Sequence, residues 1–176
     1  MNAPNDDTVA VVVRQWQSVA PGIDTGPMEL IGRVNRCAAL LQQAEEAPLR
    51  REGLTRAEFD LLGALRRTGH DLSPGELVRE TFSSGAAVTK RLRRLQERGL
   101  LERRGDTRDR RAAQVRLTGA GRALVDRLMP EQLAYERSVI GGLGEDERRE
   151  LSAGLARLLG QLEGRIGRPV EGGLGA

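Results

Sequence analysis

The 176-residue sequence has few of the side chains on which catalysis, metal binding and aromatic cores depend. Two phenylalanines, one tyrosine and one tryptophan leave the core to aliphatic side chains, which favours packed helices over an aromatic-rich sheet. The single cysteine, Cys37, excludes an internal disulfide, and the single histidine, His70, argues against a zinc site or a histidine-based catalytic relay. No Gly-rich phosphate loop is visible either. We therefore expect no cofactor, no metal and no enzymatic activity.

Long apolar runs are also absent. No stretch approaches the roughly 18 residues that cross a bilayer, and the N-terminal sequence MNAPNDD is acidic where a secretory signal would be basic. We expect a cytoplasmic protein with no membrane partner. The length fits one domain, or one domain with an accessory arm.

Basic charge is concentrated in the middle of the chain. Lys90 is the only lysine, so the count of arginines carries little weight by itself. Between Ser83 and Arg122, twelve basic and four acidic residues give a net charge of +8, and because the whole chain carries +3, the remainder carries −5. Such a segment is typical of a surface that contacts a polyanion, although a solvated arginine-rich face has the same composition.

Apolar periodicity predicts two helices within residues 1–53. An accessory helix covers residues 8–20, and a long amphipathic helix covers residues 27–47 and is ended by Pro48. Cys37 lies inside the second helix, where we expect a small core residue, with oxidant sensing as the alternative. His70 follows a glycine and is expected in an exposed turn.

Two further helix starts carry capping boxes. Thr55 and Glu58 form the first box, and Ser73 and Glu76 form the second, in which Pro74 occupies the first helical position. In both, leucine before the cap and an apolar residue inside the helix can form a hydrophobic staple. We expect helices to begin at these points.

The next helix completes a helix-turn-helix pattern. Ser84 can cap it, and Val88, Leu92 and Leu95 form one apolar stripe that belongs to the core. The opposite face carries short or cationic side chains near the start of the helix, as an element that enters a major groove requires. We predict base-edge contacts from Ser84, Ala87, Thr89 and Lys90, and phosphate contacts from Arg93 and Arg94.

A β-hairpin is predicted directly after this helix. Residues 100–104 and residues 113–117 are predicted to form two strands, and the connection between these strands is strongly charged. Arginine suits a narrow minor groove, so Arg108, Arg110 and Arg111 at the tip are predicted DNA contacts, an ordinary solvated turn being the alternative. Residues 54–117 would then form a winged helix-turn-helix DNA-binding domain.

The sequence of the C-terminal region 118–166 predicts two helices. Thr118 can cap the first, which is kinked or interrupted by Pro130, and the second starts with acids near residue 145 and carries a leucine stripe. Apolar stripes at both ends of the chain favour a helical dimerisation module over an intramolecular core. Residues 167–176 are expected to form a flexible tail.

Several motifs together resemble one known family. They are FDLL at 59–62, SPGEL at 73–77, VTKRL at 88–92, LQERGL at 95–100, DTRDRR at 106–111 and VRLTGAG at 115–121. They look like a MarR-type winged-helix transcription regulator, over residues 27–166. The resemblance implies a homodimer that pairs through its N-terminal and last two helices and presents each recognition helix and wing to half of a palindromic site.

A finer resemblance concerns regulation. QWQSVAP at 15–21, PMELIGR at 27–33 and SGA at 84–86 are similar to the PecS-type, urate-responsive branch. That branch implies a small anionic ligand held by Trp16, Asp60, Arg91 and Arg103, where an aromatic plane stacks on a flat heterocycle and two guanidiniums bind the anion. The alternatives are a core role for Trp16, pairing of Asp60 with Arg56, and phosphate contacts from both arginines.

These observations predict a mainly α fold with a two-stranded wing and a helical dimerisation module. The predicted function is a homodimeric transcriptional regulator, a repressor, that binds palindromic double-stranded DNA and is released by a small anion such as urate. A sequence-neutral architectural DNA-binding protein and a small-molecule enzyme with an arginine-lined pocket are the alternatives from other classes.

Overall fold

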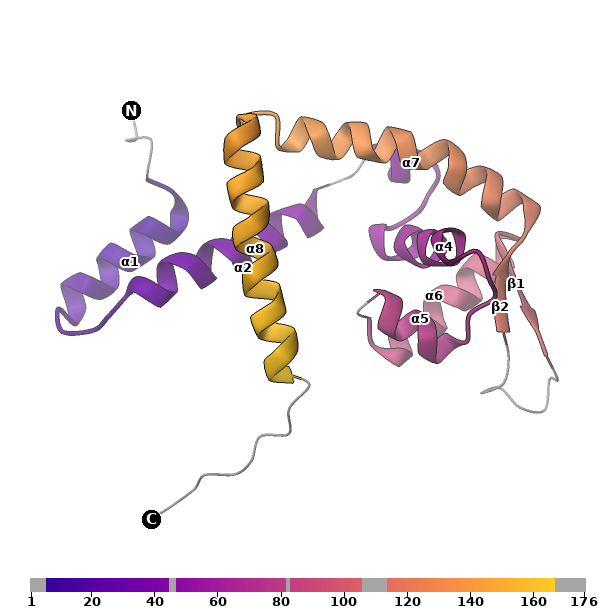
Figure 1. Cartoon of the computed structure of the whole chain (residues 1–176), viewed down its shortest axis with the longest axis horizontal. Helices are drawn as coiled ribbons and strands as arrows, with labels where there is room; N and C mark the ends of the chain where they lie inside the picture. Colours follow the sequence, from indigo (N-terminus) through magenta and orange to yellow (C-terminus); the bar gives the residue numbers. More distant parts are fainter. Residues whose placement is uncertain (1–5, 45–46, 82, 106–113, 167–176) are drawn as a thin grey trace, which may run out of the picture. The chain divides into compact units, whose positions relative to one another are not determined.

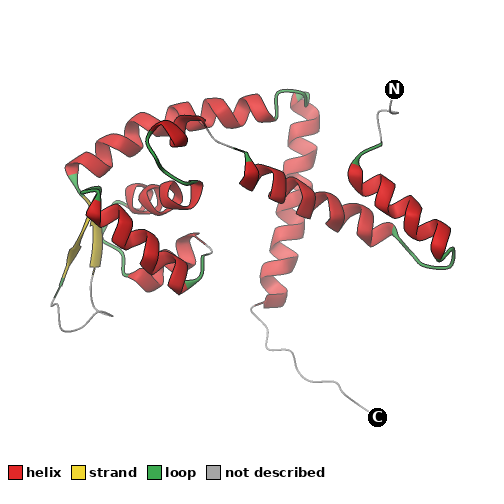
Figure 2. Cartoon of the chain, turned by 180° about the vertical axis from the view of Figure 1, so that it is seen from behind, coloured by secondary structure: helices red, strands yellow, loops and turns green. Residues whose placement is uncertain are grey.

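The computed structural model describes residues 6–44, 47–81, 83–105 and 114–166 (Figure 1). The elements are helices apart from one two-stranded antiparallel sheet, which confirms the predicted mainly α class (Figure 2). The chain forms two compact units, Met1–Gln132 and Leu133–Ala176, and the predicted division into four parts stays a prediction.

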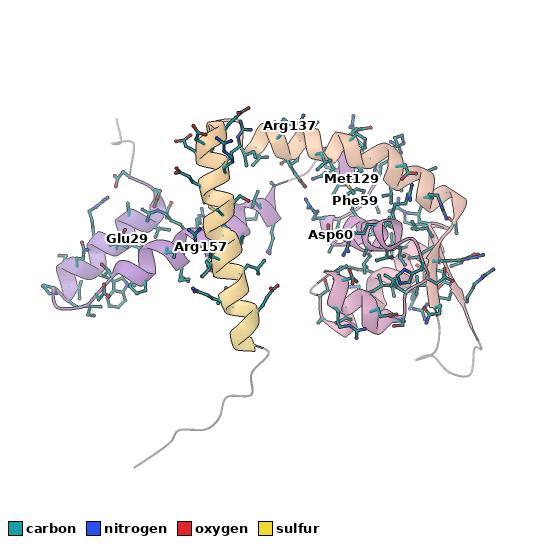
Figure 3. All side chains as sticks on the ribbon, viewed as in Figure 1. Glu29, Phe59, Asp60, Met129, Arg137 and Arg157 are labelled. Atoms are coloured by element: carbon teal, nitrogen blue, oxygen red, sulfur yellow. The ribbon has the colours of Figure 1, made fainter. Side chains whose placement is uncertain are left out.

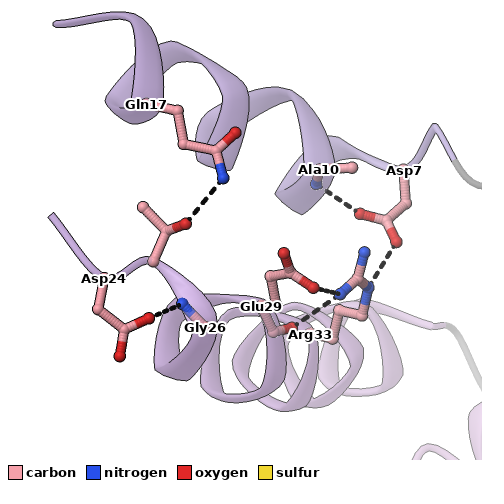
Figure 4. A network of polar contacts seen from close by, with 8 residues as sticks. Asp7, Ala10, Gln17, Asp24, Gly26, Glu29 and Arg33 are labelled. Carbon is pink, nitrogen blue, oxygen red and sulfur yellow. Dashed lines mark hydrogen bonds and ion pairs between the residues drawn. The ribbon is translucent and has the colours of Figure 1, made fainter. Parts of the chain in front are cut away.

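The first two helices, α1 (Thr8–Val19) and α2 (Gly26–Gln43), form an antiparallel hairpin. At one end Asp7 accepts from the Ala10 N–H at 2.9 Å and from Arg33 Nε at 2.8 Å, and at the other end Gln17 Nε2 donates to Thr25 Oγ1 at 3.0 Å (Figure 4). The Ala10 N–H and the Arg33 guanidinium lower the pKa of the Asp7 carboxyl. Polar bonds at both ends therefore fix the register of the two helices.

The two helices approach each other closely at a glycine. A Cβ on Gly32 would lie 2.8 Å from Cγ1 of Val9, so the absence of a side chain lets α1 lie close against α2. Val13 of α1 is buried in the same hairpin.

The prediction for the end of α2 was wrong. α2 ends at Gln43, and Pro48 lies inside a separate short helix, α3 (Ala47–Arg51), where it is buried. Proline is excluded from helix interiors but tolerated in the first turn, which needs no intrahelical N–H donor. Pro48 therefore belongs to a helix start.

The apolar stripe of α2 lies open in the single chain. No side chain between Gly26 and Gln43 is buried, and Leu40 and Leu41 are about half exposed. Cys37 is exposed as well, which corrects our prediction of a core residue. The error arose because none of the described residues buries this stripe.

Three helices form the central bundle: α4 (Arg56–Thr68), α5 (Pro74–Thr81) and α6 (Gly85–Glu97). Both capping boxes are confirmed. The Glu58 N–H donates to Thr55 Oγ1 at 3.3 Å while Glu58 Oε2 accepts from the Thr55 N–H at 2.9 Å, and the Ser73–Glu76 box has the corresponding distances of 3.2 and 2.7 Å. The staple leucines before both caps are buried.

The core of the first unit is almost entirely aliphatic, as the composition predicts. Its fully buried leucines each contribute about 1.5–3 kcal/mol relative to an exposed side chain. The side chains with no exposed surface are Leu61, Leu62, Leu77, Val88, Leu92, Leu95 and Val115. They come from α4, α5, α6 and the sheet, so these elements form one packed body.

The sheet consists of β1 (Leu101–Arg104) and β2 (Gln114–Leu117), paired with Leu101 opposite Leu117. Leu72, just before α5, adds a bridge to Val115 of β2, with two N–H to oxygen distances of 3.0 and 2.8 Å. This bridge attaches the start of the helix-turn-helix to the hairpin.

The long helix α7 (Gly119–Val139) continues through Pro130, so the helix is not interrupted there. As predicted, Thr118 caps it by accepting from the Gly121 N–H at 3.1 Å. Arg66 of α4 donates to Asp126 through Nε at 2.7 Å and Nη2 at 3.2 Å, and this pairing lowers the pKa of the Asp126 carboxyl. α7 is therefore tied to α4 by both core packing and an ion pair.

The second unit contains the end of α7 and helix α8 (Glu145–Ile166). Glu147 accepts from the Gly144 N–H at 2.6 Å, as the acidic start predicts. None of the side chains described in α8 is buried, and Leu151, Leu155 and Leu162 of the predicted stripe are each 42–52% exposed.

Candidate nucleic-acid interface

Local sequence determines how α6 is oriented. Ser84 caps the helix by accepting from the Ala87 N–H at 3.4 Å, and the stripe Val88, Leu92 and Leu95 is fully buried, as predicted. The opposite face must then point outward, because helical residues half a turn away lie on the other side.

That outward face borders a groove of about 930 Å³ between α6, the start of α5 and β1. Its lining residues are Pro74, Ala86, Thr89, Lys90, Arg93, Arg94, Gln96, Glu97 and Arg103. Four cations against one anion make the groove electropositive, which suits a phosphate backbone. We call this surface the cationic groove.

Some of the predicted DNA-contact residues line this groove, and others lie at the start of α6. Thr89, Lys90, Arg93 and Arg94 line it, whereas Ser84 and Ala87 lie at the start of α6. Sequence reasoning missed Ala86 and Glu97, although helical spacing from Lys90, four residues back and seven forward, would have found both.

The cations of the groove differ in their partners. Arg93 Nε donates to Glu97 Oε1 at 2.9 Å, and both side chains are well exposed. Arg94 Nη1 lies 3.2 Å from Oε1 of the buried Glu58. Lys90 and Arg103 form no ion pair with another residue in the described part of the chain, so their charges are available to a ligand.

The hairpin next to the groove matches the predicted wing. Glu102 of β1 lies opposite Arg116 of β2, and the two form an ion pair across the strands. The three predicted tip contacts, Arg108, Arg110 and Arg111, lie outside the described residues.

The four predicted ligand residues lie on four different elements. Trp16 of α1 is 47% exposed, so the alternative of a plain core residue is wrong. Asp60 lies beside the buried Phe59 on α4 (Figure 3). It pairs with Arg56 at 2.9 Å, as the second alternative proposed. Arg91 is partly buried on α6. Of the four, only Arg103 lines the cationic groove.

The described residues were also compared with the requirements of a metal site and of a membrane-spanning helix. They contain no group of three or more histidine, cysteine, aspartate or glutamate side chains placed to hold a metal ion. Their helices also include none with the length and apolar character that a bilayer crossing needs. His70 is exposed, as predicted, with Nδ1 3.0 Å from the Thr68 carbonyl oxygen.

Comparison with known proteins adds independent findings. A sequence profile of the MarR family matches residues 52–112. The transcriptional regulator PecS of Dickeya dadantii is 34% identical over 152 residues, which cover 85% of this chain and 92% of that protein.

Solved structures share the fold. Bordetella bronchiseptica BpsR, whose DNA binding is regulated by 6-hydroxynicotinic acid, matches with a TM-score of 0.63 and 32% identity over 73% of this chain and 98% of that one. The DNA complex of Staphylococcus aureus MepR matches with a TM-score of 0.61 and 23% identity over 73% of this chain and 93% of that one, which supports the fold alone.

These relatives are named transcriptional regulators, in agreement with the expectation of a protein that is not an enzyme. The winged helix-turn-helix geometry and the extent of the PecS match lead to the same assignment. The chain belongs to the MarR family of winged helix-turn-helix transcriptional regulators.

Proposed function

We propose that this chain is a homodimeric transcriptional repressor that binds palindromic double-stranded DNA and is released by a small planar anion such as urate. The observation that carries the proposal is the cationic groove, which lies on the exposed face of α6 and continues to Arg103 at the base of the wing. An exposed helix with short and cationic side chains can enter a major groove, where lysine and arginine reach guanine edges and phosphates.

The open apolar faces support the homodimer. Leu40 and Leu41 of α2, and Leu151 and Leu155 of α8, are each about half exposed in the single chain. Apolar stripes of this extent rarely stay in water and usually mark an interface. A two-fold dimer would place two recognition helices about 34 Å apart, one turn of DNA, which explains a palindromic site.

The nature of the effector rests on residue chemistry and on one relative. Trp16 offers an exposed aromatic plane, and Arg91 and Arg103 offer guanidiniums that form no ion pair with another described residue. BpsR responds to 6-hydroxynicotinic acid, which like urate is a flat, oxygenated nitrogen heterocycle that carries negative charge. Arg103 also lines the cationic groove, so an anion bound to it would oppose DNA binding.

A charge reversal tests the DNA interface. The double variant Lys90→Glu, Arg108→Glu should lose specific binding to a duplex from the DNA flanking its own gene, measured by gel shift, while remaining a folded dimer. The matched control, Arg149→Glu with Arg157→Glu on α8, makes the same change in net charge on exposed residues that do not line the groove, and it should still bind. Intact binding by the first variant would reject the assignment.

Competition separates a regulator from a sequence-neutral architectural protein. A true regulator should prefer its site over random duplex by at least about a thousandfold at physiological salt. A ratio near one would favour the architectural alternative, because a cationic groove by itself attracts any duplex.

Ligand titration tests the effector. Urate or 6-hydroxynicotinate added to the DNA complex should release the protein, and Trp16→Ala should weaken that response without changing DNA affinity in the absence of ligand. If neither compound releases the protein, the effector assignment fails while the DNA-binding assignment stands.

A further inference from the structure

Arg94 of α6, the proposed recognition helix, and Arg98, which follows that helix, bond to the turn before α4 and to Glu58 in α4. Arg94 Nη1 lies 3.2 Å from Glu58 Oε1, and Arg94 Nη2 donates to the Gly53 carbonyl oxygen at 3.4 Å. Arg98, which follows α6, donates to the Gly53 carbonyl through Nη1 at 3.1 Å and to the Glu52 carbonyl through Nη2 at 2.7 Å. Both guanidiniums therefore bond to acceptors of the protein itself, although both side chains are exposed to solvent.

The shape of the turn makes these carbonyls available. Gly53 has a φ of +61°, its N–H donates to the Arg50 carbonyl at 2.9 Å, and the Leu54 N–H donates to the Leu49 carbonyl at 3.0 Å. This pair of bonds is a Schellman motif, which ends α3 and uses the carbonyls of Leu49 and Arg50. The carbonyls of Glu52 and Gly53, which the motif does not use, accept from Arg98 and Arg94.

The buried carboxylate of Glu58 requires a cationic partner. Glu58 is only 2% exposed, and its Oε2 already accepts from the N–H and the hydroxyl of Thr55 at 2.9 and 3.1 Å. The other oxygen, Oε1, pairs with Arg94. A buried carboxylate is tolerated only when charged or hydrogen-bonded partners replace its water. The Glu58 carboxylate of the capping box therefore favours the ion pair with Arg94.

The same turn also holds α7. Arg127 Nη2 donates to Glu52 Oε1 at 2.8 Å, and Arg51 of α3 pairs with Glu131. One short turn, residues 52–54, is therefore bonded both to the recognition helix and to the helix that continues into the second unit.

We propose that Arg94 and Arg98 are positioning residues: they fasten α6 to the turn at residues 52–54 and to buried Glu58, and so set the angle at which the recognition helix meets DNA. This inference rests on the proposed DNA-binding function. It replaces the phosphate contact that the sequence predicted for Arg94, and it gives Arg98 a role that the sequence did not indicate. Arg93, one residue away and directed at solvent with Glu97, keeps its predicted contact with phosphate.

A double-mutant cycle on DNA affinity tests the proposal. Arg94→Gln should lower affinity for the flanking duplex about tenfold, and the same change in a Glu58→Gln background should lower it less than about twofold, because the partner is already neutral. The dependence of log affinity on log salt should keep its slope in Arg94→Gln, since no phosphate contact is lost. Arg93→Gln is the matched control: its slope should fall by about one unit, and its effect should be equal in both backgrounds.

If Glu58→Gln does not fold, as its melting curve will show, Arg98→Gln replaces it. The Arg98 guanidinium donates to backbone carbonyls and not to Glu58, so the capping box stays intact, and affinity should again fall at constant salt slope. A slope lower by about one unit in Arg94→Gln, or equal effects in both backgrounds, overturns the inference. Unchanged affinity in Arg94→Gln or in Arg98→Gln overturns it too. Loss of all duplex binding by the unmodified protein would instead be a failure of the proposed function.

Discussion

Replacing Gly121 with alanine should destabilise the protein severely, because no space exists for one methyl group. A Cβ at this position would lie 1.9 Å from the Leu100 carbonyl oxygen, 2.9 Å from the Leu100 carbonyl carbon and 3.2 Å from Leu117 Cδ2. The obstacle is mainly backbone, so no change of rotamer can relieve it. The first turn of α7 would have to move away from the end of the recognition helix by more than about 1 Å.

The cost follows from two effects. Forcing a methyl group into a packed site costs about 1–3 kcal/mol. The movement also lengthens the bond from the Thr118 N–H to the Leu100 carbonyl, 3.2 Å in this structure, which adds about 1 kcal/mol. A total of about 3 kcal/mol corresponds to a melting temperature lower by about 6–12 °C for a chain of this size.

Thermal unfolding followed by circular dichroism measures this effect, with Gly119→Ala as the matched control. Gly119 begins the same helix, and a Cβ there would have nothing within 4 Å, so alanine should change stability by less than about 0.5 kcal/mol. Adding Leu117→Ala should not rescue Gly121→Ala, because the carbonyl clash remains. A melting temperature for Gly121→Ala within about 2 °C of the control, or full rescue by the second change, would refute the reasoning.

Three further predictions concern other parts of the chain. Thr118→Val removes a hydroxyl that accepts from the Gly121 N–H and donates to the Gly99 carbonyl, so urea unfolding should show a loss of about 1–2 kcal/mol; an unchanged midpoint would contradict the cap. The Asp126 pKa is lowered in the folded state, so its stabilisation is present above the unfolded pKa of about 3.9 and disappears as the pH falls through the lower folded value. The melting temperature of Asp126→Asn should accordingly lie below that of the parent at pH 7 and converge with it near pH 2, whereas a constant difference would rule out this linkage. If the proposed dimer forms through α8, Leu155→Glu should convert it to a monomer in sedimentation, and a variant that still dimerises would exclude the α8 stripe from the interface.

The parts of the fold that sequence predicted well are those in which the deciding interactions are local. A capping box is read from four residues, and both boxes form with the predicted partners. The α6 stripe likewise depends only on spacing within one helix. The exception is Pro48, where a local rule was applied one-sidedly: proline marks helix starts as well as helix ends.

Predictions failed where the deciding partner is distant or lies outside the single chain. Cys37 was expected in a core because Val34 and Leu41 share its helix, yet the residues that the structure describes leave the stripe of α2 unburied. Arg94 was predicted to contact phosphate because it lies on the outward face of α6, and nothing in that local pattern reveals its pairing with the buried Glu58, 36 positions earlier, so the phosphate contact stays an untested prediction.

Arg103 connects the two halves of the proposed regulation. Sequence resemblance placed it with Trp16 and Asp60 in a ligand site, whereas the structure places it in the cationic groove with Lys90, at the base of the wing. One guanidinium cannot neutralise a ligand anion and a DNA phosphate at the same time, because each contact uses the same fork of donors. In the proposed regulation, competition for this single charge would release the protein from DNA without a large movement of α6. Arg103→Gln should therefore reduce the salt slope of DNA binding by about one unit and also abolish release by ligand, whereas loss of only one of these properties would assign Arg103 to that site alone.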